Sequence, residues 1–143
     1  MPDTLDGRFE LIVLHFFFVY NLLKEKNKET LSEEITKIMF KDFDMSLREM
    51  GVGDLSVGKK VKRIAEGFYG RLDAYDVATL NAGTESLSRA LERNIYFGLE
   101  VKPEKGVEAL TDYFQKQIDN IDGTTFEHLS KGFIDFYSPS EYT

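Results

Sequence analysis

The side chains that most often perform enzyme chemistry are few in this sequence and lie far apart. It contains two histidines, His15 and His128, and no cysteine. The lack of cysteine excludes a disulfide scaffold, a cysteine-ligated zinc site, an iron–sulfur cluster and a cysteine nucleophile. Neither histidine has a second ligand-type residue at the spacing of a helical metal pair, so a local hydrogen bond is the favoured interpretation of the His15 imidazole. We therefore expect no metal site and no cofactor.

Two further patterns resemble functional motifs but lack the context that such motifs need. Residues 51–53, Gly-Val-Gly, look like the start of a dinucleotide-binding loop, but they follow a helical pattern and Ser56 replaces the third glycine. Neighbouring carboxylates such as Asp42 and Asp44 are typical of a solvated helix surface. No serine, histidine and acid stand in an order that indicates nucleophilic catalysis. The sequence predicts a protein that is not an enzyme.

A cluster of basic residues stands out because the chain as a whole is acidic. The 143 residues include 18 Lys or Arg and 25 Asp or Glu, a net charge of −7, which argues against sequence-specific binding of nucleic acid. The cluster comprises Lys59, Lys60, Lys62, Arg63 and Arg71. At about 100° per residue these positions lie opposite an apolar stripe and form an outward basic surface. This surface is either an ordinary solvated helix face or one that meets lipid or ribosomal phosphates.

Two glycines interrupt the same predicted helix, in the sequence Gly67-Phe68-Tyr69-Gly70-Arg71. Phe68 belongs to the apolar stripe, Tyr69 lies at its boundary, and both glycines project onto the basic surface. A glycine in a helix interior costs about 1 kcal/mol relative to alanine. We therefore expect that the helix ends or bends here, or that another backbone approaches closely.

The elements that must position these residues have helical spacing throughout. The apolar segment 9–23 contains Glu10, His15 and Asn21. As a helix it would be about 22 Å long, which is too short to cross the roughly 30 Å hydrocarbon layer of a membrane. It is either the central helix of a bundle or a helix that exposes part of its circumference to an apolar partner.

Helix-start and helix-stop signals divide the remaining chain. They are capping boxes in residues 30–33 and 123–127, an N-cap at Asp54, a first-turn proline at Pro103, and breaks at residues 50–54 and 81–84. The apolar stripes include Leu31, Ile35, Ile38, Met39 and Phe43 of one helix, Val57, Val61, Ile64, Phe68, Leu72 and Tyr75 of the next, and Leu129 and Phe133 of the last. The predicted fold is all-α, a single-domain bundle of about six or seven helices over residues 1–143, with frayed ends at 1–6 and 138–143.

Four stretches, in order along the chain, resemble the ubiquinol–cytochrome c chaperone family, the assembly factors of respiratory complex III. They are Leu14-His15-Phe16-Phe17-Phe18; Asp42-Phe43-Asp44 with Leu47-Arg48-Glu49-Met50-Gly51-Val52; Val57-Gly58-Lys59-Lys60-Val61-Lys62-Arg63; and Phe68-Tyr69-Gly70-Arg71 leading to Ala74-Tyr75-Asp76. A weaker match continues through residues 91–96, so that the resemblance covers roughly residues 8–120.

The resemblance implies a non-enzymatic chaperone that binds newly made cytochrome b and promotes assembly of complex III. The residues that it assigns to the client or to a small helper subunit are Phe68, Tyr69, Gly70, Arg71, Tyr75 and Asp76. The residues expected to face an anionic membrane or the ribosome are Lys59, Lys60, Lys62 and Arg63. The acidic start of the chain has no targeting character, so we expect a bacterial-type, cytoplasmic protein, peripheral at the inner face of the plasma membrane. The alternative is a peripheral membrane-surface or apolar-ligand-binding bundle without a dedicated cytochrome b client.

Overall fold

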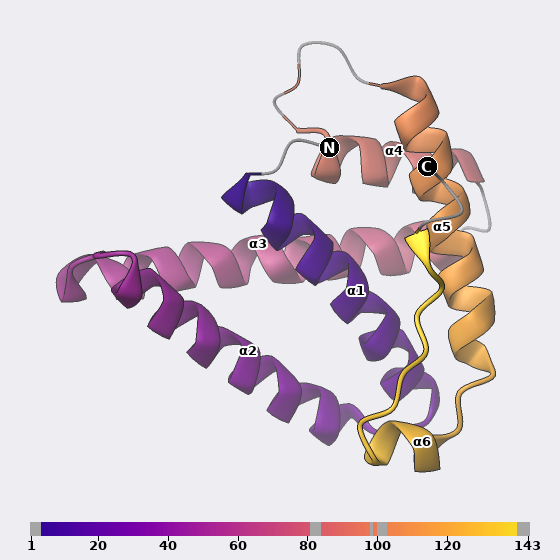
Figure 1. The fold of residues 1–143 in the computed structure, drawn as a ribbon, viewed down its shortest axis with the longest axis horizontal. Coiled ribbons are helices and arrows are strands. Elements are labelled where there is room, and N and C mark those ends of the chain that lie inside the picture. The colour runs from indigo at the N-terminus through magenta and orange to yellow at the C-terminus, as the bar shows by residue number, and fades with distance from the viewer. Residues whose placement is uncertain (1–3, 81–83, 98, 100–102, 140–143) are drawn as a thin grey trace.

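Six α-helices make up the fold in the computed structural model of the chain, which describes residues 4–80, 84–97, 99 and 103–139. They are α1 (Leu5–Glu25), α2 (Glu29–Glu49), α3 (Asp54–Leu80), α4 (Thr84–Ile95), α5 (Glu104–Asp122) and α6 (Phe126–Ser130), as Figure 1 shows. No strand is found within the described ranges. The prediction of an all-α bundle is confirmed.

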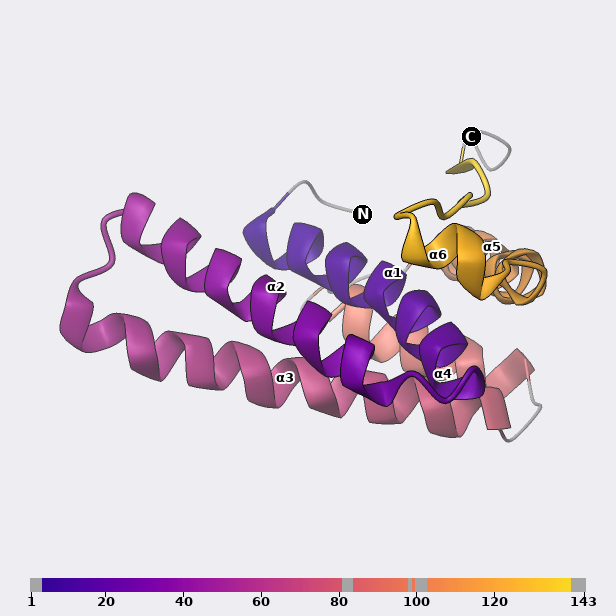
Figure 2. The same cartoon turned by 90° about the horizontal axis from the view of Figure 1, so that it is seen from below.

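Helix α1 lies at the centre of the bundle and packs against α2, α3, α4 and α5 (Figures 1 and 2). Its core-facing side chains include Val13, Leu14, Phe17, Phe18, Leu22 and Leu23, all fully buried. The ring of Phe17 stacks on Phe114 of α5 with centroids 5.5 Å apart, and Phe16 meets Phe68 of α3 edge-on at 5.0 Å. Such ring pairs stabilise a core beyond the area that they bury. The central-helix interpretation of the apolar segment is confirmed.

The N-terminal helix begins earlier than the expected fraying suggests. Leu5 and Asp6 belong to α1, and the Thr4 side chain caps it by accepting a hydrogen bond from the Gly7 N–H at 3.1 Å. Residues 1–3 and 140–143 of the two predicted ends lie outside the described part of the chain. Among the described helices, none combines the length and the hydropathy that crossing a bilayer requires.

Helices α2 and α3 form a long hairpin whose turn projects beyond the rest of the bundle (Figures 1 and 2). The turn is a Schellman motif, in which the Gly51 N–H donates to Arg48 O and the Val52 N–H donates to Leu47 O. Gly51 has φ +84°, a conformation that glycine adopts without steric cost. The predicted break at residues 50–54 is therefore confirmed, and its cause is this turn.

Several predicted helix starts are displaced. The capping box predicted in residues 30–33 is wrong, because α2 begins at Glu29 and Thr30 already lies inside it. Asn27, with φ 54°, turns the chain sharply after α1, so that the next helix starts at once. The N-cap of that helix is Lys28, which makes no side-chain capping bond.

Three other starts are wrong by one residue. Asp54 is the first residue of α3, not its N-cap, and the carbonyl of Gly53 accepts the first hydrogen bonds of that helix. Pro103 is the N-cap of α5 rather than a first-turn residue. Thr125 caps α6 through its side chain, as the second capping signal indicates, although the box itself would have begun at Thr124. The break expected at 81–84 falls mostly on residues 81–83, which lie outside the described residues.

The predicted apolar stripe of α2 is only partly buried. Ile38 is 62% exposed and Leu31 is 36% exposed, whereas Ser32 and Thr36 are buried. The Thr36 hydroxyl donates to Ser32 O at 2.7 Å, so the helix itself satisfies this buried polar group. Ile35, Met39 and Phe43 of the predicted stripe are half-buried, so the core-facing side of α2 overlaps that stripe but is rotated toward Ser32 and Thr36.

The chain after α6 is extended and lies against α5. The buried Gln117 side chain donates to Tyr137 O at 2.9 Å and accepts the Tyr137 N–H at 3.0 Å. Asn120 Nδ2 donates to Asp135 O at 2.6 Å. Phe133, predicted for the last helical stripe, lies beyond the end of α6 and is 65% exposed, so that prediction is wrong.

Candidate partner-binding site

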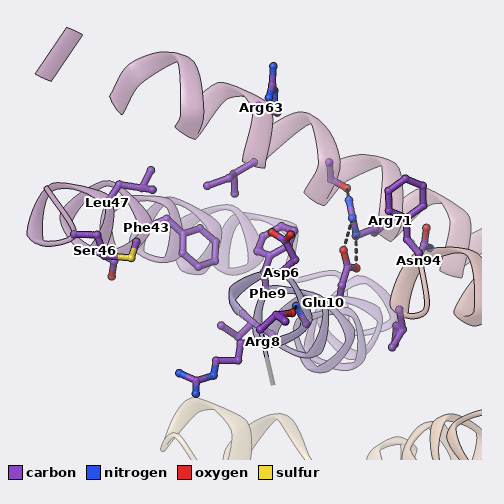
Figure 3. Close-up of a pocket in the computed structure, with 18 of the residues that line it drawn as sticks. Asp6, Arg8, Phe9, Glu10, Phe43, Ser46, Leu47, Arg63, Arg71 and Asn94 are labelled. Carbon is purple, nitrogen blue, oxygen red and sulfur yellow. Dashed lines mark hydrogen bonds and ion pairs between the residues drawn. The ribbon is translucent and has the colours of Figure 1, made fainter. Parts of the chain in front are cut away.

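A cleft of about 770 Å³ opens between the N-terminal half of α1, the C-terminal half of α2, the middle of α3, and the end of α4 with the chain after it (Figure 3). Its walls are largely apolar. The apolar residues that line it are Phe9, Ile12, Phe43, Leu47, Met50, Ile64, Ile95, Phe97 and Leu99. Three of them are accessible at the mouth, because Phe97 is 85%, Met50 55% and Ile12 46% exposed. A contiguous accessible apolar surface of this kind is typical of a binding site.

The cleft also explains how α1 can be both apolar and central. Its second half is buried in the core, while Phe9 and Ile12 of its first half face the cleft. The helix is therefore central to the bundle, and Phe9 and Ile12 leave part of its circumference at the cleft.

An ion pair between Glu10 of α1 and Arg71 of α3 forms one wall of the cleft (Figure 3). Arg71 Nε donates to Glu10 Oε2 at 2.5 Å, and Arg71 Nη2 donates to the other carboxylate oxygen. The Glu10 side chain is 7% exposed and that of Arg71 is 25% exposed. This two-point geometry is the strong form of a charged hydrogen bond. Arg71 thus turns toward α1, and its predicted place on the outward basic surface is wrong.

Gly67 provides the space that this arginine occupies. Arg71 Nη1 donates to Gly67 O at 2.9 Å, one turn back along α3, and a Cβ at position 67 would lie 2.8 Å from Nη1. Helix α3 continues to Leu80, and Figure 2 shows it as one continuous helix. The group that approaches Gly67 is a side chain, so the predictions of a helix end and of a close backbone contact are wrong. A Cβ at Gly70 would meet nothing within 4 Å.

Two buried polar atoms lie near this ion pair. Tyr75 Oη and Asn94 Nδ2 are buried and have no hydrogen-bond partner among the described residues. Burial raises the pKa of the Tyr75 hydroxyl well above its usual value. The Tyr75 hydroxyl therefore stays neutral at physiological pH.

His15 is committed to hydrogen bonds within the protein. Its Nδ1 lies 2.8 Å from Leu11 O, which can only accept, so Nδ1 carries the proton. Its Nε2 then accepts from the Tyr113 hydroxyl at 2.8 Å. The predicted local hydrogen bond is confirmed. In the described part of the chain, no three His, Cys, Asp or Glu residues are grouped so that they could hold a metal ion.

Two of the six residues predicted to contact a partner belong to the core. Phe68 and Tyr75 are fully buried, and the Phe68 ring packs edge-on against Phe16 and Phe40. Neither side chain can reach a partner from these positions. Their burial makes them positioning residues for α3.

The other four predicted residues do not share one surface. Tyr69 is 57% exposed and lies on the opposite side of α3 from Arg71, because residues two apart on a helix point in different directions. Asp76 also lies away from the cleft and binds Lys24 of α1 at 2.8 Å. Gly70 is exposed, and only Arg71 of the six lines the cleft.

Four members of the basic cluster lie where the helical wheel predicts. Lys59, Lys60, Lys62 and Arg63 are all exposed. Arg63 stands at the rim of the cleft and points away from its floor (Figure 3). Lys62 lies 3.9 Å from Glu66, a distance at which an exposed ion pair contributes little.

Sequence reasoning missed the apolar lining of the cleft, above all Phe9, Phe43 and Phe97. One signal could have found part of it. Three of the four stretches that carry the family resemblance contribute to the cleft, through Phe43 and Leu47 of the second, Arg63 of the third and Arg71 of the fourth. The sequence alone does not show that these stretches meet at one cleft in the folded protein.

This chain is similar in fold to a solved structure and similar in sequence to two named proteins. The crystal structure of the Cbp3 homolog from Brucella abortus superposes with a TM-score of 0.82 at 36% identity, covering 98% of this chain and 77% of that one. The ubiquinol-cytochrome c reductase complex assembly factor 1 proteins of Mus musculus and Xenopus laevis are each 26% identical over 131 residues, or 90% of this chain. The match spans 44% of the mouse protein and 64% of the frog protein, so this chain covers less than two thirds of either.

The family comparison agrees with these relatives and covers almost the whole sequence. The family model described as ubiquinol-cytochrome C chaperone matches residues 1–136. The matched region includes all six helices and every residue that lines the cleft. The chain belongs to the ubiquinol–cytochrome c chaperone family.

Proposed function

We propose that this protein is a chaperone for the assembly of ubiquinol–cytochrome c reductase, respiratory complex III, and that its client is newly made cytochrome b. Membership of the family and the names of the mouse and frog relatives support the assembly role. The observation that carries the proposal is the accessible apolar cleft, because a chaperone needs a surface that can cover apolar segments of its client.

The size of the cleft suits the side chains of one apolar helix. A volume of about 770 Å³ is within the range of small-ligand sites and accommodates a few large side chains, not a whole subunit. An apolar helix presents such side chains at three- and four-residue steps, which is how helices bind in grooves. Phe97, Met50 and Ile12 at the mouth would make the first contacts with it.

The Glu10–Arg71 pair keeps the cleft suitable for an apolar client. An unpaired carboxylate in this wall would oppose the burial of apolar surface beside it, whereas the arginine neutralises it. With Glu10, Arg71 and His15 all engaged within the protein, the proposed role involves binding and no catalysis. Tyr69, Gly70 and Asp76 face away from the cleft, and we assign them to a separate contact with a small helper subunit.

Deletion of the gene followed by complementation tests this function. Loss of the protein should lower assembled complex III and haem-loaded cytochrome b, and the wild-type gene should restore both. Phe97→Asp should fail to restore them, because a charge at the mouth opposes an apolar client. Ile38→Asp is the matched control, since Ile38 is also exposed but lies on α2 outside the cleft. Unchanged complex III in the deletion strain would refute the proposal.

A further inference from the structure

The turn of the α2–α3 hairpin projects from the rest of the bundle (Figures 1 and 2). Exposed apolar side chains lie at this turn. Leu55, in the first turn of α3, is 95% exposed, more than any other large apolar side chain of the described residues. Met50, at the end of α2, is 55% exposed. Both side chains are therefore accessible to a partner outside the fold.

Basic residues surround this apolar tip. Residues 55–63 hold four basic side chains and no acidic one. Leu55, Lys59 and Lys62 follow at steps of four and three residues, so they lie along one face of α3. Lys60 and Arg63 flank that face, and neither they nor Lys59 form an ion pair with the described residues.

The tip also carries two acidic residues, Glu49 and Asp54. Asp54 pairs with Arg48, which also binds Asp44 at 2.6 Å. The chain as a whole carries a net charge of −7. Residues 48–63 hold five basic and two acidic side chains, a net charge of +3, so the rest of the chain carries −10. An anionic surface would therefore orient the molecule with this segment foremost.

We propose that the hairpin tip docks on an anionic lipid bilayer. Leu55 and Met50 enter the boundary between head groups and acyl chains, while Lys59, Lys60, Lys62 and Arg63 bind lipid phosphates. This combination of apolar residues with basic neighbours is the chemistry of proteins that lie on a membrane surface. It does not favour a nucleic acid, because residues 50–63 contain no aromatic side chain on which a base could stack.

The docked orientation would also bring the cleft to the membrane. Met50 and Arg63 belong both to the tip region and to the lining of the cleft. A client segment leaving or approaching the bilayer would then meet the cleft mouth directly. This last step rests on the proposed function, whereas the lipid contact itself does not depend on any client.

Vesicle flotation of the purified full-length protein tests the docking. The protein should float with vesicles of phosphatidylcholine and phosphatidylglycerol, and high salt should lower the fraction that floats. It should not float with vesicles of phosphatidylcholine alone. Leu55→Ser should weaken partitioning about tenfold, because an inserted side chain is lost. Lys59→Glu/Lys62→Glu should weaken it on the order of 30-fold or more, because two attractive charges become repulsive.

Matched controls make the result specific to the tip. Ile38→Ser removes another exposed apolar side chain, and Lys41→Glu/Lys105→Glu makes the same change of charge elsewhere. Both should float like the wild type. The proposal is wrong if the wild type fails to float with anionic vesicles, if the controls lose as much binding as the tip variants, or if the tip binds RNA with Leu55→Ser having no effect. If a tip variant that no longer floats still restores complex III, the chaperone function does not depend on membrane docking.

Discussion

At the residue scale, the Glu10–Arg71 pair joins α1 and α3 in one wall of the cleft, and its contribution to stability depends on both partners. Removing one partner of a buried pair leaves the other charge uncompensated, which typically costs about 3 kcal/mol. Gly67 is part of the same arrangement, since the arginine folds back over it. The three residues thus act as one unit, although 61 positions separate Glu10 from Arg71.

A double-mutant cycle tests this unit. Gly67→Ala in the wild type should destabilise the protein, because the new Cβ would lie 2.8 Å from Arg71 Nη1 and displace the guanidinium from Glu10. In an Arg71→Ala background the same change should stabilise by about 1 kcal/mol, since only helix propensity remains. The free energy of unfolding in urea measures both. An effect of the same sign in the two backgrounds would show that Gly67 and Arg71 are independent.

Tyr75 gives a second residue-scale prediction, on the dependence of stability on pH. Burial raises the pKa of its hydroxyl, so above about pH 10 the unfolded chain loses this proton while the folded chain keeps it. Stability should therefore fall as pH rises above 10, by up to about 1.4 kcal/mol per pH unit for this group. The pKa of Lys24, raised by its hydrogen bond to Asp76, and that of Tyr96, raised by burial, add to the same alkaline loss.

The variant Tyr75→Phe isolates the tyrosine contribution. It keeps the ring in the core and removes a hydroxyl that has no partner among the described residues, so at pH 7 stability should be unchanged or higher by about 1 kcal/mol. The alkaline decline should become shallower, with the part due to Lys24 and Tyr96 remaining. Thermal unfolding followed between pH 7 and pH 11 would show this. A decline as steep as that of the wild type would exclude Tyr75 as its source.

At the element scale, the hairpin between α2 and α3 depends on one backbone conformation. Gly51 has φ +84°, and a side chain there would be strained, so Gly51→Ala should destabilise the protein by about 1 kcal/mol. Gly70→Ala is the matched control, because it adds the same methyl group to open space in a helix interior. It should stabilise the protein by about 1 kcal/mol. Urea unfolding of the two variants should therefore shift in opposite directions, and a shared direction would contradict this account of the turn.

The elements also show where local signals suffice and where they do not. The break at residues 50–54 could be predicted, because glycine at a Schellman turn is a local requirement. The start of α2 could not, because Asn27 in a left-handed conformation overrides the capping signal in residues 30–33. The buried side of α2 could not be predicted either, because Ser32 and Thr36 are buried while Ile38 is exposed. Periodicity gives the helix, but packing decides which of its sides is covered.

At the scale of the whole molecule, the cleft is a product of tertiary structure. Its residues come from four helices and from the chain after α4. The sequence could indicate the stretches that supply Phe43, Arg63 and Arg71, through the family resemblance, but not which side of α3 faces the cleft. For that reason the predicted set placed Tyr69 and Arg71 together, although they lie on opposite sides of the helix. The distinction between core, cleft and outer surface arises only when the helices pack.

The most direct test of the central claim is site-specific photo-crosslinking in cells that are synthesising complex III. A photoreactive phenylalanine analogue replaces Phe97 at the mouth of the cleft or, as the control, Phe133 in the extended chain after α6; these residues are 85% and 65% exposed. If the cleft holds the client, newly made cytochrome b should be captured from position 97 and not from position 133. Capture from position 133 alone, or of no complex III subunit from either, would contradict it.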